Sequence, residues 1–182
     1  MRAIILIIVL VFSHFGFSQD TIDTTTVTEI TFEDLLEWNM MEFTAPEGLI
    51  EILPIENRQM NYEKAFKHPT KRFEVRYAIR NQDIGFYQQI FEMTVLNISG
   101  GQLPEYSPFG TEAVKEEFNA DAGATVMVQA GSEFGQDYKY CLLVYIYKKG
   151  VGDGYVFYMA DDNALILEMM NPIFHALKFS PE

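Results

Sequence analysis

The sequence predicts an α+β fold, a three-layer α/β/α sandwich built around a mainly antiparallel sheet. Three observations lead to this prediction. Residues 71–80, "KRFEVRYAIR", alternate strictly between apolar and polar positions, as a strand does. Residues 138–149, "YKYCLLVYIYKK", are apolar on both faces, as expected of a central strand covered on both sides. Segments with helical spacing lie between and after the strands, so helices are expected to cover the sheet.

The N-terminus predicts an export signal. Arg2 precedes the apolar run "AIILIIVLVF", and Gly16-Phe17-Ser18 forms a small-x-small cleavage site. The run is about half the ~20 apolar residues that a membrane span needs, so we expect cleavage after Ser18 and no stable membrane insertion; a retained anchor is the alternative. No cysteine follows the run, which argues against a lipid anchor. The expected location is periplasmic or secreted.

Residues 1–18 are therefore a signal peptide, and Thr- and Asp-rich residues 19–30 form a flexible leader. Residues 31–182 are a single domain. It begins with a hairpin in which "EWNMMEF" and "LIEILPI" flank "TAPEG", because Pro46 presets φ and Gly48 permits a tight reversal. In the next strand one face carries Phe73, Val75, Tyr77 and Ile79, and the other face, polar, meets solvent or a partner.

Helices and strands follow in order. A helix over 84–98 ends at Gly100-Gly101 and, being apolar on most sides, should be well covered. A shorter helix, "TEAVKEEF", has Thr111 as its expected N-cap. Strands over 124–130, 138–149 and 154–160 come next. Asp161 or Asp162 caps a final helix, "NALILEMMNPIFHALKF", which Pro172 kinks or restarts.

This element order, the "F-x-x-P-x-G" hairpin (Phe43, Pro46, Gly48) and the terminal "ALKF" resemble the PsbP/Mog1-like superfamily over about residues 38–180. "EFNADAGATVMV" and "YKYCLLVYIYK" also look like an exported family of Bacteroidota. The superfamily resemblance implies a binding or assembly protein and supplies no shared catalytic motif.

Few residues support catalysis or metal binding. Cys141, the one cysteine, lies in an apolar strand, where a buried inert thiol is expected. His68 precedes Pro69 in an exposed loop and His175 lies on the last helix; neither accompanies a nucleophile motif. Asp121 is expected to shape a turn and Asp161–Asp162 to cap a helix rather than to bind calcium, since the EF-hand spacing is missing. No cofactor or metal is expected.

Positive charge is concentrated in one segment of an acidic chain. The formal net charge is −13, yet residues 58–80 hold seven Lys/Arg and two acids. Arg72, Arg76 and Arg80 share one strand face with Glu74 and Ala78, where successive positions lie ~6.6–7 Å apart, and Lys71 lies at the edge of this basic row. Such a row could hold carboxylates or phosphates by forked hydrogen bonds. The alternative is internal neutralisation by Glu74 or by hairpin acids such as Glu37, Glu42 and Glu51.

Two function classes are consistent with the sequence. The favoured class is an exported, non-enzymatic binding or adaptor protein that contacts an acidic envelope protein or a small anion through the basic row. The alternative is a carboxylate-dependent hydrolase of envelope or extracellular polymer. Nucleic acid is a poor partner for a chain of this net charge. An open basic sheet face would favour the first class, and a pocket with two converging acids the second.

Overall fold

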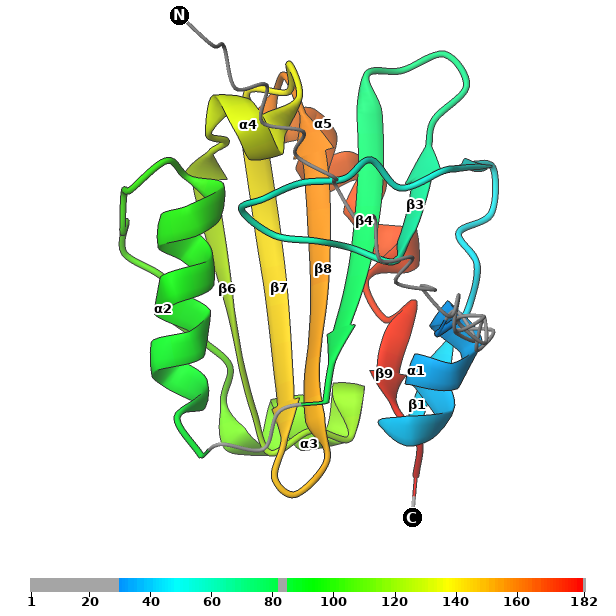
Figure 1. Ribbon diagram of the computed structural model, residues 1–182, viewed down its shortest axis with the longest axis vertical. Coiled ribbons are helices and arrows are strands. Elements are labelled where there is room, and N and C mark those ends of the chain that lie inside the picture. The colour runs from blue at the N-terminus through cyan, green and yellow to red at the C-terminus, as the bar shows by residue number, and fades with distance from the viewer. Residues whose placement is uncertain (1–29, 82–84, 182) are drawn as a thin grey trace, which may run out of the picture.

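A seven-stranded antiparallel sheet dominates the mixed α/β fold (Figure 1). The computed structural model describes residues 30–81 and 85–181, so the expected signal peptide and most of the leader lie outside the described residues. Across the sheet the strand order is β2 (Ile50–Ile52), β3 (Lys64–Lys67), β4 (Phe73–Arg80), β8 (Gly152–Ala160), β7 (Tyr140–Lys148), β6 (Ala122–Gln129) and β5 (Ser107–Pro108). A separate two-stranded sheet pairs β1 (Met41–Phe43) with β9 (Leu177–Phe179).

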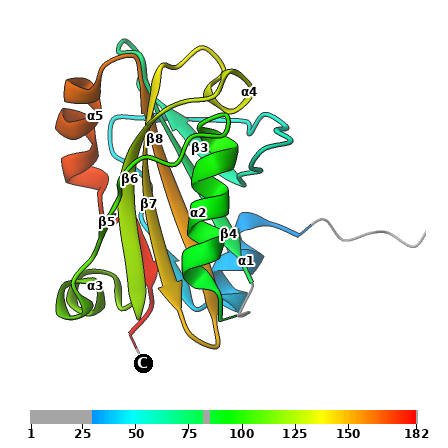
Figure 2. The ribbon, with the colours of Figure 1, turned by 90° about the vertical axis from the view of Figure 1, so that its left-hand side faces the viewer.

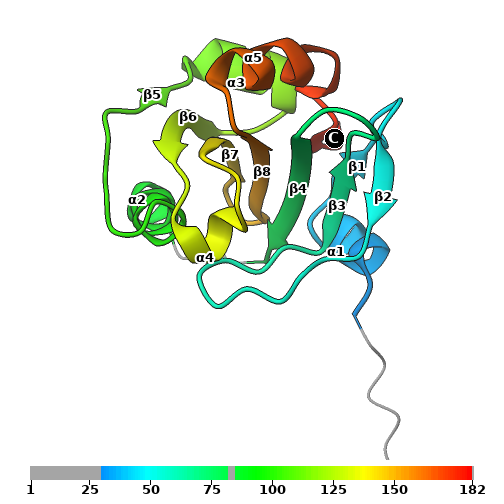
Figure 3. The same cartoon turned by 90° about the horizontal axis from the view of Figure 1, so that it is seen from above.

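Helices lie on both faces of the large sheet (Figures 2 and 3). α2 (Tyr87–Ile98) and the single turn α4 (Ser132–Gly135) lie on one face, while α3 (Thr111–Phe118) and α5 (Asn163–Met170) lie on the other. The helix α1 (Phe32–Trp38) lies beside β1, and the 3₁₀ turn η1 (Asn171–Ile173) follows α5. Each face therefore has its own apolar core.

The central strands confirm the sequence patterns. On β7, Leu142, Val144 and Ile146 join the core under α3 and α5, while Cys141, Leu143, Tyr145 and Tyr147 join the core under α2 and α4. Strand β4 contributes Phe73, Val75, Tyr77 and Ile79 to the α5 side, as predicted. The polar face of β4 was expected to meet solvent or a partner, and at the centre of the strand this expectation is wrong: Glu74 is buried and Arg76 is fully inaccessible.

The long loop before β3 explains that difference. Residues 53–62 run back across the β4 face to α4, where the Asn57 side-chain amide donates to the Glu133 carbonyl over 3.0 Å. The Phe134 backbone N–H donates to the Gln59 side chain over 2.9 Å. Loop and α4 together cover the polar side chains of β4, and alternation within the strand gives no sign of this cover.

The expected N-terminal hairpin does not form. β1 pairs with β9 and β2 with β3, so the two segments that flank "TAPEG" belong to different sheets. The preceding segment is helical because Thr31 and Asp34 form a capping box at the start of α1. At the other end, "ALKF" is strand β9 rather than helix, since η1 ends the helical segment.

Smaller expectations differ in detail. Asp162 caps α5, as one of two predicted candidates, but the N-cap of α3 is Gly110 and Thr111 is its first helical residue. Strands β3 and β5 and helix α4 were not predicted. α2 ends at Ile98 as expected, yet its outer surface is open, with Phe86 just before the helix and Met93 each 63% exposed.

Candidate functional site

Arg76, the middle member of the basic row, is part of the core. Its Nε donates to the Glu74 carboxylate over 2.6 Å, and its Nη1 donates to the Phe134 carbonyl over 2.6 Å. Its Nη2 donates to the Gln136 side chain over 3.1 Å. The guanidinium also lies against the rings of Tyr62 and Phe134, 4.8 and 5.1 Å from their centroids. With its side chain 0% exposed, Arg76 cannot reach a partner in this fold.

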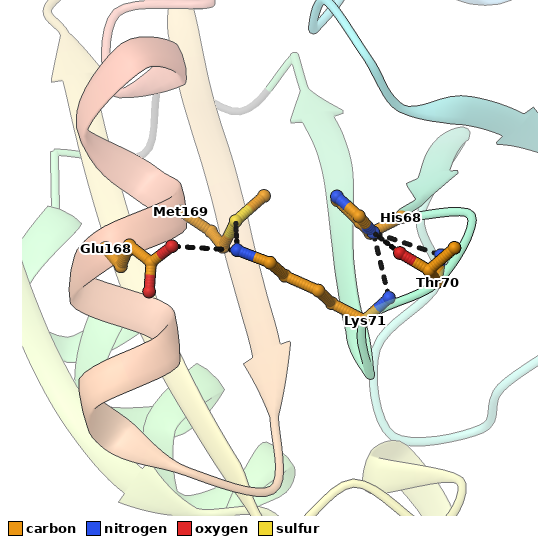
Figure 4. Close-up of polar contacts among 5 residues, drawn as sticks. All are labelled: His68, Thr70, Lys71, Glu168 and Met169. Atoms are coloured by element: carbon orange, nitrogen blue, oxygen red, sulfur yellow. Dashed lines mark hydrogen bonds and ion pairs between the residues drawn. The ribbon is translucent and has the colours of Figure 1, made fainter.

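Lys71 and Arg72 are exposed but engaged with acidic residues. Lys71 Nζ donates to Glu168 of α5 over 2.8 Å, and its backbone N–H donates to His68 Nδ1 (Figure 4). Arg72 Nε pairs with Asp161 at 2.6 Å, and its Nη2 donates to the Asp137 carbonyl over 2.8 Å. The ion pairs of Lys71 and Arg72, which directly precede β4, therefore join the start of this strand to Glu168 of α5 and to Asp161.

Arg80 is partly buried at the far end of β4. Its Nη1 donates to Glu63 over 2.6 Å, and its Nη2 donates to the Asn61 carbonyl. The four residues of the basic row therefore form no common open surface. Internal neutralisation by Glu74 is confirmed, but Glu51 and Glu42 pair with Lys64 and Lys178 instead of the arginines.

The arginines instead hold a loop with unusual backbone geometry. Gln136 and Asp137 both have positive φ, 46° and 77°, which non-glycine residues seldom adopt. Arg76 bonds the side chain of the first, and Arg72 bonds the carbonyl of the second. The two contacts fix the turn between α4 and β7, and this is a structural role for the basic row.

A pocket lies at the opposite side of this face, between α2 and strands β5 and β6. We call it the α2 pocket; its volume is about 220 Å³, and it is lined by Tyr87, Gln88, Phe91, Tyr106, Pro108, Gly123, Ala124 and Tyr145. Four of these eight residues are aromatic. Gly123 and Ala124 on β6 form the small side of the pocket, and a larger side chain at Ala124 would fill the space. A side chain at Gly123 would instead point to the other face of the sheet, against Phe109 and Val114.

Ring contacts fix the aromatic walls. Phe91 meets Tyr106 edge-on, with centroids 4.9 Å apart, and meets Tyr145 at a tilt with centroids 5.5 Å apart. Tyr87 stacks on Tyr147 at 5.0 Å. Because α2 supplies two of these residues one turn apart, the helix and the sheet together determine the shape of the pocket.

A carboxylate lies beside the pocket. Glu92 Oε1 accepts hydrogen bonds from the Tyr106 hydroxyl over 2.9 Å and from the Gln88 side-chain amide over 3.0 Å. The hydrogen bond to Glu92 raises the pKa of Tyr106, since it holds the phenolic proton. The rim of the pocket is thus polar and acidic.

A buried polar pair lies on the same side of the sheet. The Tyr145 hydroxyl donates to Asp153 over 2.8 Å, and Asp153 is fully buried on β8. Burial, reinforced by the neighbouring Asp153, raises the pKa of Tyr145 far above its ordinary range. Tyr145 is therefore a neutral, fixed wall of the pocket.

The other reactive side chains have structural surroundings. Cys141 is buried, and burial raises the pKa of its thiol to about 12, so it is not a nucleophile at neutral pH. His175 is exposed beside Glu117, with 3.1 Å between Nε2 and the carboxylate. Asp121 accepts from the Lys149 backbone N–H, in the turn-shaping role expected of it. Within residues 30–81 and 85–181 no group of three His, Cys, Asp or Glu is placed to hold a metal ion.

The sequence did not single out the α2 pocket, because its aromatic residues were interpreted as core. The one available signal was the run of small residues Ala122, Gly123 and Ala124 at the start of β6. No family model, curated protein or solved structure matches this chain. In the part of the chain that the structure describes, none of the helices has the length and apolar character to span a bilayer.

Proposed function

We propose that this chain is an exported, non-enzymatic binding protein and that the α2 pocket is its contact site. One observation carries the proposal: a pocket with aromatic walls and a polar rim opens beside a helix that exposes the apolar side chains of Tyr87, Met93 and Leu96. Pockets of this composition are typical of ligand sites. Exposed apolar side chains that gather on one helix favour contact with a partner.

The contacts of the basic row give less support to an anion-binding role than the α2 pocket gives to its own binding role. Arg76 is buried, and the remaining members form internal ion pairs, so an acidic partner would have to displace Glu168, Asp161 or Glu63. Each of four surface pockets is lined by at most one carboxylate, which gives the hydrolase alternative no converging pair. Both considerations favour binding at the α2 pocket.

The proposal extends to the architecture. α2 and α4 cover one face and α3 and α5 the other, which supports a three-layer α/β/α sandwich. The PsbP/Mog1-like resemblance remains part of the proposal, and its binding and assembly proteins agree with a non-enzymatic function.

Occupancy of the pocket can be tested with small probes. Amide NMR spectra of the purified protein would be recorded with benzyl alcohol, choline and acetate, which represent a neutral ring, a cation and an anion. We expect at least one probe to shift the Gly123 and Ala124 signals, and Ala124→Leu to abolish the shifts by filling the pocket. If none of the probes moves these signals, the pocket is not a binding site. If acetate shifts only the signals of Lys71 and Arg72, the basic row is the anion-binding site instead.

A further inference from the structure

We propose that the α2 pocket binds an organic cation of the quaternary ammonium type, an inference that rests on the proposed binding function. The chemical class follows from three features of the pocket: its aromatic walls, the carboxylate at its rim and its size.

The aromatic walls suit a cation. Tyr87, Phe91, Tyr106 and Tyr145 supply four rings, and the face of an aromatic ring carries the negative part of its quadrupole. Phe91 is inclined at 71° to Tyr106 and at 37° to Tyr145, so these rings form walls at angles to one another rather than a parallel stack. Rings at several angles around one space are the arrangement that holds quaternary ammonium groups.

The charges around the pocket have the matching sign. Glu92 bonds two lining residues, Tyr106 and Gln88, which places its carboxylate at the rim. None of the eight lining residues is a Lys, Arg or His. The chain carries a formal net charge of −13, so its field attracts cations and repels anions.

The size of the pocket and its largely apolar lining distinguish between types of cation. A cavity of roughly 150 Å³ holds a benzene molecule, so about 220 Å³ is enough for a trimethylammonium group. A primary ammonium has three N–H donors that need acceptors, whereas a quaternary ammonium has none. The largely apolar walls therefore favour the methylated cation.

Two probes of the same shape separate charge from size. Choline and 3,3-dimethyl-1-butanol differ in that a positive nitrogen replaces a neutral carbon, and each would be titrated while the Gly123 and Ala124 amide signals are followed. We expect choline to bind about tenfold more tightly, the order of a favourable cation–π contribution. Ala124→Leu should abolish binding of both probes.

Glu92→Gln tests the rim, with Glu168→Gln as its control. Both variants remove one negative charge, but Glu168 lies on α5, on the opposite face, where it pairs with Lys71. We expect only Glu92→Gln to weaken choline binding, by severalfold. Equal weakening by both variants would overturn the role of Glu92 and leave only the net charge of the chain.

Two further outcomes of these titrations would overturn one or both proposals. Equal or tighter binding of the neutral alcohol would overturn the cation inference and leave the binding function of the pocket intact. Failure of benzyl alcohol, choline, acetate and the neutral alcohol alike to shift the pocket signals would overturn both proposals.

Discussion

Replacing Arg76 with Met tests whether the basic row is structural. The variant leaves the carboxylate of Glu74, a buried residue that is only 5% exposed, without its cation. It also removes the donors to the Phe134 carbonyl and the Gln136 side chain. Breaking a buried ion pair by removing one partner costs about 3–5 kcal/mol. In urea unfolding this corresponds to a fall of the midpoint on the order of 2 M, for a slope of about 2 kcal/mol/M.

The same substitution at Arg72 is the matched control. The Arg72 side chain is 54% exposed and pairs with a partly exposed Asp161, so its loss should cost no more than about 1 kcal/mol. The double variant Glu74→Gln/Arg76→Met should be more stable than Arg76→Met alone, because no unpaired carboxylate stays buried. Equal losses for Arg72→Met and Arg76→Met would refute the buried clamp, and so would a double variant as unstable as Arg76→Met.

Three further predictions follow from caps and buried groups. Thr31→Ala should lower the free energy of unfolding by about 1 kcal/mol, since it breaks a capping box. Thr111→Ala should have little effect, because the structure gives Thr111 no capping hydrogen bond, and melting curves of the two variants compare them directly. Cys141 should resist iodoacetamide in the folded protein and react once urea unfolds it, so rapid native labelling would contradict its burial. Burial, with a smaller effect of Glu74, raises the pKa of Tyr138 to about 12. The unfolded chain therefore loses this proton near pH 10, while the folded chain keeps it, so the stability of the fold should decrease above pH 10. A flat profile of urea midpoints between pH 9 and 11.5 would contradict this.

The sequence predicted the central strands because burial there follows from the strand's own residues. Strand β7 is apolar at every position from Cys141 to Tyr147, so any covered sheet accommodates it. For β4, the sequence predicted the buried apolar face correctly, but it wrongly predicted that the polar face is accessible. Whether Arg76 meets water depends on residues 53–62 and on α4, which are distant in sequence, and no local pattern encodes their contact.

The ends of the domain were harder to predict for a related reason. β1 and β9 are three residues each, too short for alternation to identify, and each forms a strand because the other lies beside it. The α2 pocket was missed because an aromatic residue in a core and one in a pocket wall have the same sequence pattern. Only the run of small residues at the start of β6, Ala122 to Ala124, distinguishes the two.

The pairing of β1 with β9 constrains the order in which the chain can fold during synthesis. Met41 pairs with Phe179 and Ser180 donates to the Met40 carbonyl, so this ladder joins residues that are almost the whole domain apart in sequence. A chain that emerges N-terminus first cannot complete the ladder until residues 177–180 are available. Until then β1 lacks its partner, and the nascent chain remains incompletely folded.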